Sequence, residues 1–275
     1  NPQEKGPPAS GVGTIKELYG PVDLEIHYGK DGRFYAVDTA RVFPPVHPNS
    51  FKRRKTLGYM VNLFRFEFLR TTNSQVNPDI HSPFYLKPEY ITEEREPTEL
   101  LLYQIISAAH ALDVFYEKSQ NKQDPHSQAY HRLLSEMDIP TWFHAHGFNL
   151  RYFGNVYLAL RSTELKNRIL TLMVTRVVKD EIKKKLRESL KKSVKEKLEV
   201  VAQLLNQVLD PKDSFWNEQL KNALQEKYDG KLSQVEMSPE FNLRDKVDLN
   251  KILQDIQPLV GIRFMYGSGN TDSFV

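Results

Sequence analysis

The residue with the clearest potential for chemistry is Asp38, which ends an alternating polar and apolar segment, residues 33–38. A carboxylate that follows a strand can hold a divalent metal ion, and in phosphotransferases such an ion neutralises phosphate charge. The alternative is a structural role, in which Asp38 pairs with Arg41 or caps the turn after the strand. Structural carboxylates outnumber catalytic ones, so the second interpretation is favoured.

The segment around Asp38, residues 32–41, is similar to the strand and metal-binding aspartate of kinase-like folds. The other parts of such a site are missing from the sequence, which has neither a glycine-rich phosphate loop nor an upstream His-x-Asp loop. A kinase-like phosphotransferase fragment with Asp38 as metal ligand is therefore kept as the alternative function, and the balance favours a chain without catalytic activity.

The histidines give a weak signal for a metal. His144 and His146 could place two imidazoles near one ion, but zinc normally takes three or four protein ligands and no third one is apparent. The chain has no cysteine, which excludes disulfides and cysteine-based zinc sites. We predict no metal site and no cofactor.

A basic segment, residues 179–197, contains nine Lys or Arg and four Asp or Glu. It could follow the phosphates of RNA or bind an acidic partner. The favoured alternative is a solvated helix face on which Asp180 pairs with Lys184 and Glu181 with Lys185. The aromatic residues that single-strand binders use for stacking are absent here. If the chain binds RNA, the candidate residues are Arg53, Arg54, Lys183, Lys184, Arg187, Lys191 and Lys192.

The elements that would position these residues can be read from the patterns of the chain. Asp31-Gly32 between two alternating segments predicts a β-hairpin that ends at Pro44-Pro45. Phenylalanine at every second position of residues 63–69 favours a further strand, although so short a segment also fits a helix. Helical spacing begins near Pro97, and one apolar stripe runs from Met173 to Leu209.

Length and composition indicate a soluble globular chain. It has 275 residues, 40% of them hydrophobic and 27% charged, and a net charge of +3. That charge is too small to indicate nucleic-acid binding by itself, so any basic surface must be local. No apolar stretch approaches the roughly 20 residues that span a bilayer, and we predict no membrane span. The absence of cysteine fits a reducing compartment such as the cytoplasm.

The predicted fold class is α+β and predominantly helical, with a small N-terminal hairpin or sheet region packed on a helical C-terminal part. Residues 1–13, rich in proline and glycine, are predicted to be a flexible lead-in. Residues 14–275 are predicted to form one domain, with a β-rich part at 14–95, a helical part at 96–266 and a tail at 267–275.

Three segments in a consistent order resemble the clustered-mitochondria family. Residues 27–45 resemble its signature GxDGRxYxLDxxRxFPP, residues 146–154 resemble its HGINxRYLG turn, and residues 63–69 resemble LxRPEFV, with Phe66 where proline is expected. The residues that carry the two stronger matches are Asp31, Gly32, Arg33, Asp38, Arg41, Pro44, Pro45, Gly147, Asn149, Arg151, Tyr152 and Gly154.

The resemblance covers most of residues 14–265 and implies a central domain of this family, or a similar module of a larger protein. The family is cytosolic, is linked to messenger-RNA binding and mitochondrial distribution, and is associated with eukaryotic translation initiation. It is not known as an enzyme family. The implied function is a non-catalytic binding or scaffold module whose partners are RNA, ribosome-associated proteins or other proteins.

Overall fold

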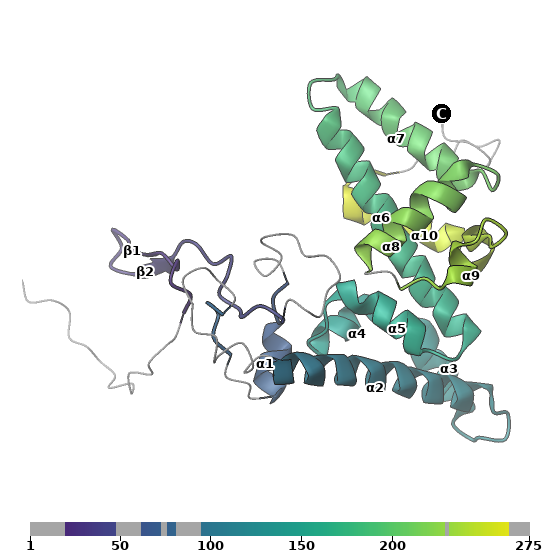
Figure 1. Cartoon of the computed structure of the whole chain (residues 1–275), viewed down its shortest axis with the longest axis horizontal. Helices are drawn as coiled ribbons and strands as arrows, with labels where there is room; N and C mark the ends of the chain where they lie inside the picture. The colour runs from purple at the N-terminus through teal and green to yellow at the C-terminus, as the bar shows by residue number, and fades with distance from the viewer. Residues whose placement is uncertain (1–19, 48–61, 73–75, 81–94, 229–230, 264–275) are drawn as a thin grey trace, which may run out of the picture.

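The computed structural model describes residues 20–47, 62–72, 76–80, 95–228 and 231–263, and helices predominate in them (Figure 1). The elements are β1 (Ile26–Tyr28), β2 (Phe34–Ala36), α1 (Phe66–Thr72), α2 (Arg95–Gln120), α3 (Ser127–Glu136), α4 (Ile139–Ala145), η4 (Leu150–Tyr152), α5 (Phe153–Ala159), α6 (Thr163–Glu188), α7 (Val194–Leu209), η5 (Phe215–Gln219), α8 (Leu220–Lys227), α9 (Gln234–Met237), η6 (Leu243–Lys246) and α10 (Leu249–Val260). The predicted class, predominantly helical α+β, is confirmed.

The predicted hairpin is present. β1 and β2 pair antiparallel with His27 opposite Tyr35, and Gly32 supplies the positive φ of +78° that the turn needs. The carboxylate of Asp31 accepts a 2.5 Å bond from the hydroxyl of Tyr35. All six strand residues are exposed, so the hairpin projects from the helical part, and the chain that follows it makes the attachment (Figure 1).

The predicted strand at residues 63–69 is wrong, because most of this segment lies in helix α1. Phe64 and Phe68 are four residues apart, both buried, and stack with their ring centroids 5.3 Å apart, whereas Phe66 is exposed. The apolar period is therefore the helical one. Within the described part of residues 14–95, strand structure amounts to β1, β2 and one isolated bridge between Pro45 and Leu63, so this part is not β-rich.

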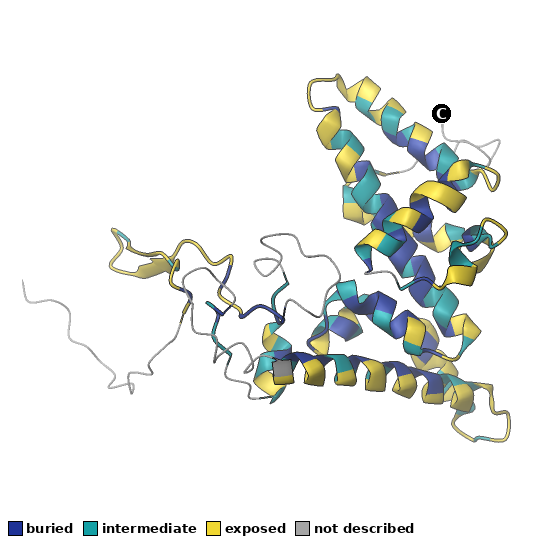
Figure 2. Ribbon diagram, in the orientation of Figure 1, coloured by how far each residue is buried: buried dark blue, intermediate teal, exposed yellow. Residues whose placement is uncertain are grey.

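Helix α6 is the centre of the helical part and packs against α10, α8, α5 and α7. Its first five turns are apolar on several faces, and a helix of that kind is stable only when other helices surround it. Ser162 caps its start by accepting a bond from the amide of Leu165. Figure 2 shows the resulting core as the buried stretch of α6 between its neighbours.

The single stripe predicted from Met173 to Leu209 is divided between two helices. α6 ends at Glu188 and α7 begins at Val194, where Ser193 and Glu196 form a capping box that starts the new helix. Both helices pack against each other as a hairpin that projects from the body (Figure 1). Leu190 and Val194, which were predicted to belong to the stripe, lie where α6 turns into α7 and are each 73% exposed.

Candidate functional site

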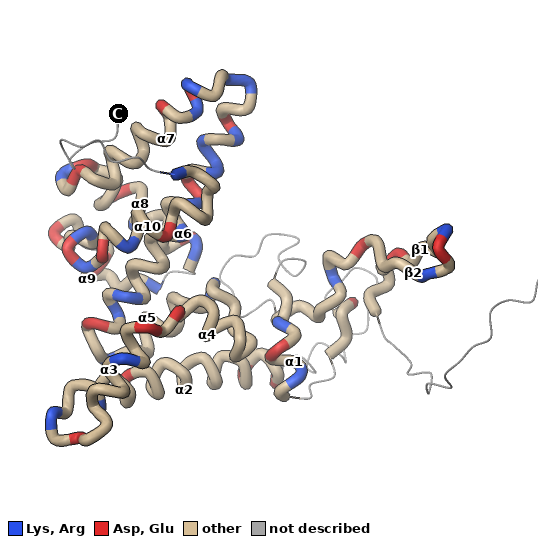
Figure 3. Tube along the Cα trace, turned by 180° about the vertical axis from the view of Figure 1, so that it is seen from behind, with Lys and Arg blue, Asp and Glu red and all other residues tan. Residues whose placement is uncertain are grey.

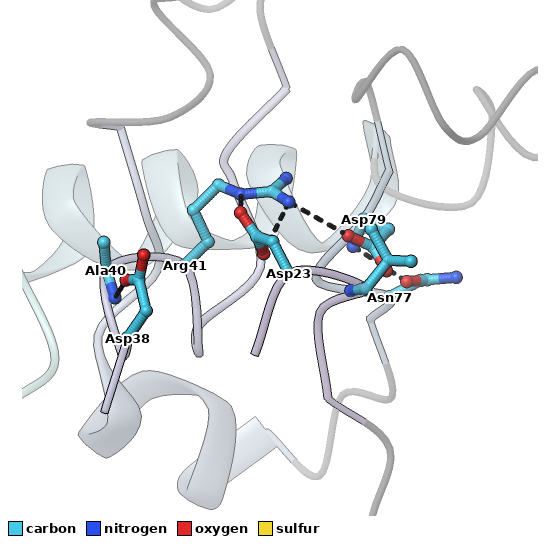
Figure 4. A network of polar contacts seen from close by, with 7 residues as sticks. Asp23, Asp38, Ala40, Arg41, Asn77 and Asp79 are labelled. Atoms are coloured by element: carbon cyan, nitrogen blue, oxygen red, sulfur yellow. Dashed lines mark hydrogen bonds and ion pairs between the residues drawn. The ribbon is translucent and has the colours of Figure 1, made fainter. Parts of the chain in front are cut away.

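Asp38 and Arg41 belong to different contacts (Figure 4). The carboxylate of Asp38 accepts a 3.1 Å bond from the backbone amide of Ala40, so it caps the turn after β2, as one of the two structural alternatives predicted. Arg41, only 5% exposed, instead forms ion pairs with Asp23 at 2.7 Å and Asp79 at 3.4 Å. Its hydrogen bond lowers the pKa of Asp23. A pairing of Asp38 with Arg41 is therefore wrong.

The geometry around Asp38 lends no support to a metal-dependent phosphotransferase. Among the described residues, no three His, Asp or Glu side chains come together as a group that could hold a metal ion. This includes His144 and His146: the Nδ1 of His146 lies 2.8 Å from the carbonyl oxygen of Trp142, and burial lowers the pKa of His144. Asp38 itself is exposed.

The two motifs of the sequence meet at residues 62–64, which we call the joint. The amide of Val46 donates to the carbonyl of Asn62 at 2.6 Å, and the amide of Phe64 donates to the carbonyl of Pro44 at 2.9 Å. From the helical side, the amide group of Asn149 donates to the carbonyl of Leu63 at 3.0 Å. The guanidinium of Arg151 donates to the same carbonyl at 3.2 Å and also to the side chain of Asn62.

The glycines beside the joint are needed for close packing. Gly147 has φ +80°, and a Cβ placed there would lie 2.4 Å from the backbone nitrogen of Phe68 in α1. A Cβ at Gly154 would lie 2.6 Å from Cγ of Lys231. Tyr152, between them, is buried. The second motif therefore holds the N-terminal segment and α1 against the helical part, which is an architectural role.

Five of the seven predicted basic residues gather at one place, the end of the α6–α7 hairpin (Figure 3). We call residues 183–198 the basic tip. They hold eight Lys or Arg against Glu188 and Glu196, and Glu196 is engaged in the capping box of α7. The exposed members predicted from sequence are Lys183, Lys184, Arg187, Lys191 and Lys192. Sequence reasoning missed Lys195, which is exposed on the same tip; Arg53 and Arg54 lie outside the described residues.

The predicted pair between Asp180 and Lys184, which would offset this charge, is wrong. Asp180 instead forms ion pairs with Lys179, at 2.6 Å, and with Lys227 of α8. Burial acts to raise the pKa of Asp180, but the hydrogen bonds from both lysines lower it overall. Since Asp180 is drawn back toward the body, the positive charge of the tip remains available to a partner.

Comparisons with known families match two separate regions of the chain. The family model described as translation initiation factor eIF3 subunit 135 matches residues 137–274, half of the chain. The chain belongs to the translation initiation factor eIF3 subunit 135 family. The model described as clustered mitochondria matches residues 6–47, which confirms the resemblance seen in the sequence. Neither the curated proteins nor the solved structures contain a match to the chain.

The eIF3 subunit 135 match includes the second motif, the basic tip and all the helices from α4 onward. The clustered-mitochondria match ends at His47, just after the residues that bond to the joint. The contacts of Asn149 and Arg151 with the joint therefore connect the two matched regions. In the helices that the structure describes, none is both long and apolar enough for a membrane span.

This connection predicts a local effect of Arg151→Ala. Without the guanidinium, the carbonyl of Leu63 loses one of two side-chain donors, and the strand-like contact of residues 44–46 with the joint should open more often. We expect the amides of Val46 and Phe64 to exchange hydrogen at least several-fold faster, while amides in the middle of α6 are unchanged. Arg132→Ala, which removes an exposed ion pair with Glu136, is the control and should change neither.

Proposed function

We propose that this chain is a non-catalytic, cytoplasmic binding module of the translation machinery, linked to mitochondrial distribution, and that its basic tip binds RNA. The observation that supports the RNA contact is the tip itself, where eight basic residues stand against two acidic ones in a chain whose total charge is only +3. Such a local excess attracts phosphates and releases their counterions. The two family matches support the translation context.

The chemistry of the tip favours contact with the phosphate backbone. Residues 183–198 include no aromatic side chain, so bases have no stacking platform there. Recognition would rest on phosphate spacing and helix shape, as in binding of duplex RNA. The exposed Leu190 and Val194 beside the lysines add apolar contact area, and for this reason ribosome-associated proteins are included among the proposed partners.

The test is RNA binding across a salt series with single-stranded and duplex probes of the same sequence. A variant with Lys184, Lys191 and Lys192 each replaced by glutamine should bind at least tenfold more weakly. Its dependence of log K on log salt should flatten by up to about 3, because each phosphate contact to a duplex contributes about 0.9.

The matched control replaces Lys122, Lys212 and Lys246 by glutamine. These three lysines are exposed but lie away from the tip, so the control carries the same loss of charge. Equal binding by the two triple variants would argue against the tip as the RNA contact. No binding of the parent above background at low salt would remove the RNA proposal altogether.

A further inference from the structure

A large cavity lies along the first half of α6, away from the basic tip. Its volume is about 960 Å³, and its walls come from α3, α6, α10 and the end of α2. The apolar part of the lining includes Leu134, Met137, Ile139 and Leu172. A cavity of this size, lined by apolar side chains with a few polar groups among them, has the character of a binding site.

Two arginines of α6 line this cavity without a partner. Arg168 and Arg176 are both partly buried, and within the described part of the chain neither forms a hydrogen bond or an ion pair. Burial is the main cause of the lowered pKa of both guanidinium groups. Because withdrawing a charge from water is unfavourable unless an opposite charge compensates it, an anionic group in the cavity would be stabilised there.

Carboxylates also line the cavity, but they are mostly exposed and already engaged. They belong to Glu136, Asp138, Glu164, Asp248 and Asp255. Four of them accept a hydrogen bond or form an ion pair within the chain, from Arg132, Thr141 or Lys251. Glu164 is exposed and attracts Arg168 without an ion pair. Since exposed charges are weakened by water and partly buried ones much less, the two arginines decide which group the α6 wall attracts.

We propose that this cavity binds a short acidic segment of a partner protein, with one carboxylate on Arg168 and another on Arg176. A guanidinium group can donate two parallel hydrogen bonds to one carboxylate, which makes arginine well suited to this contact. The exposed carboxylates around the cavity would repel a chain of phosphates. The ligand therefore differs from the RNA proposed for the basic tip, and the proposal does not depend on that function.

The spacing of the two arginines sets the spacing of the acidic residues in the ligand. Arg168 and Arg176 are eight residues apart on α6, which is about 12 Å at roughly 1.5 Å per residue. An extended peptide covers this distance in about four residues at roughly 3.3 Å each. We therefore expect two acidic residues three or four positions apart, with apolar residues between them against the apolar lining.

The first experiment selects random octapeptides displayed on phage against the whole chain. The chain carries glutamine in place of Lys184, Lys191 and Lys192, so that acidic peptides do not collect on the basic tip. The selected peptides should be enriched in pairs of Asp or Glu three or four positions apart. A selection that yields no binders, or binders without acidic residues, would overturn the proposal whether or not the tip binds RNA.

The dissociation constant of the best selected peptide, made synthetically, is then measured on variants of the same chain. Arg168→Gln and Arg176→Gln should each raise it about tenfold or more, because each leaves one carboxylate of the peptide without its partner. Arg161→Gln is the matched control, since Arg161 is an exposed arginine just before α6 that does not line the cavity. Equal effects of all three substitutions would place the peptide elsewhere and overturn the site.

The second experiment separates a binding role of Arg176 from a structural one. Arg176→Met removes an unpaired, partly buried charge, so the melting temperature of the free chain should stay the same or rise while peptide binding is lost. A clear fall in the melting temperature would assign Arg176 to the stability of the fold and overturn its role in binding. Duplex RNA that binds the tip variant and is released by Arg168→Gln and Arg176→Gln would assign the cavity to nucleic acid instead.

Discussion

Gly147→Ala is expected to lower the free energy of unfolding by about 3 kcal/mol or more, the largest effect of any small substitution in the second motif. A left-handed backbone costs an L-residue about 1–2 kcal/mol. The new methyl group would also lie 2.4 Å from the backbone nitrogen and 2.6 Å from Cα of Phe68. Since these are backbone atoms of α1, the helix must shift, and overpacking of this kind costs about 1–3 kcal/mol.

Gly261→Ala separates the two contributions. Gly261 ends α10 with φ +72°, close to the value at Gly147, but a Cβ there has no neighbour within 4 Å. Urea unfolding should therefore show a loss of only about 1–2 kcal/mol for this control, the backbone cost alone. If the two variants lost the same stability, the close approach of α1 to Gly147 would not matter, and the architectural role of the second motif would fail.

The parts of the fold that could be predicted are those fixed by neighbouring residues. Asp31-Gly32 specifies a tight turn, and the structure has the hairpin there. The strand predicted for residues 63–69 was wrong because Phe64, Phe66 and Phe68 together fit a period of two. Only Phe64 and Phe68 are buried, and their spacing of four residues also fits a helix. A short segment does not separate the two periods; burial against the rest of the fold does.

The division of the long stripe did have a local signal. Ser193 three residues before Glu196 is a capping box, and it marks the start of α7 in the middle of what reads as one apolar repeat. Its effect is that the chain reverses there and carries the lysines to an exposed tip. A continuous helix would instead have put Leu190 and Val194 in the same buried stripe as Met173.

The polar partners could not be predicted from sequence. Arg41 forms an ion pair with Asp79, which is 38 residues away in a loop. Lys227 forms an ion pair with Asp180, for which helix spacing predicted Lys184 as the partner. Pairs of this kind depend on which elements the tertiary fold brings together, and this cannot be predicted from the spacing of residues along the chain. The motif residues Asn149 and Arg151 were found only through the family resemblance, and their contact, the joint, emerged from the structure.

A second large effect is expected at Lys221, which no pattern in the sequence singled out. This lysine of α8 is completely buried, and its ammonium group donates 2.6 Å bonds to the carbonyls of Ser238 and Phe241. Lys221→Ala should lower the free energy of unfolding by about 4 kcal/mol, because it creates a cavity and leaves two partly buried carbonyl acceptors without their donor. Urea unfolding at pH 7 measures this loss.

Two further variants assign that loss to its causes. Lys221→Met keeps the volume of the side chain and removes only the donor, so it should lose about 2 kcal/mol. Lys227→Met is the surface control: it removes a partly exposed ion pair with Asp180 and should lose less than about 1 kcal/mol. If Lys221→Met were as stable as the parent, the two carbonyl bonds would contribute nothing, and packing alone would explain the burial of this lysine.

The pH dependence of stability in the parent and in Lys221→Met tests whether the charge of Lys221 is buried. Burial lowers the pKa of Lys221 in the folded state, so between that pKa and the unfolded value of about 10.4 the unfolded chain binds more protons. The stability that this group contributes must then rise with pH across that window. The parent should gain stability relative to Lys221→Met between pH 7 and pH 10, while the titration of all other groups cancels in the difference. A constant difference would mean that the ammonium group is as well solvated in the folded chain as in the unfolded one.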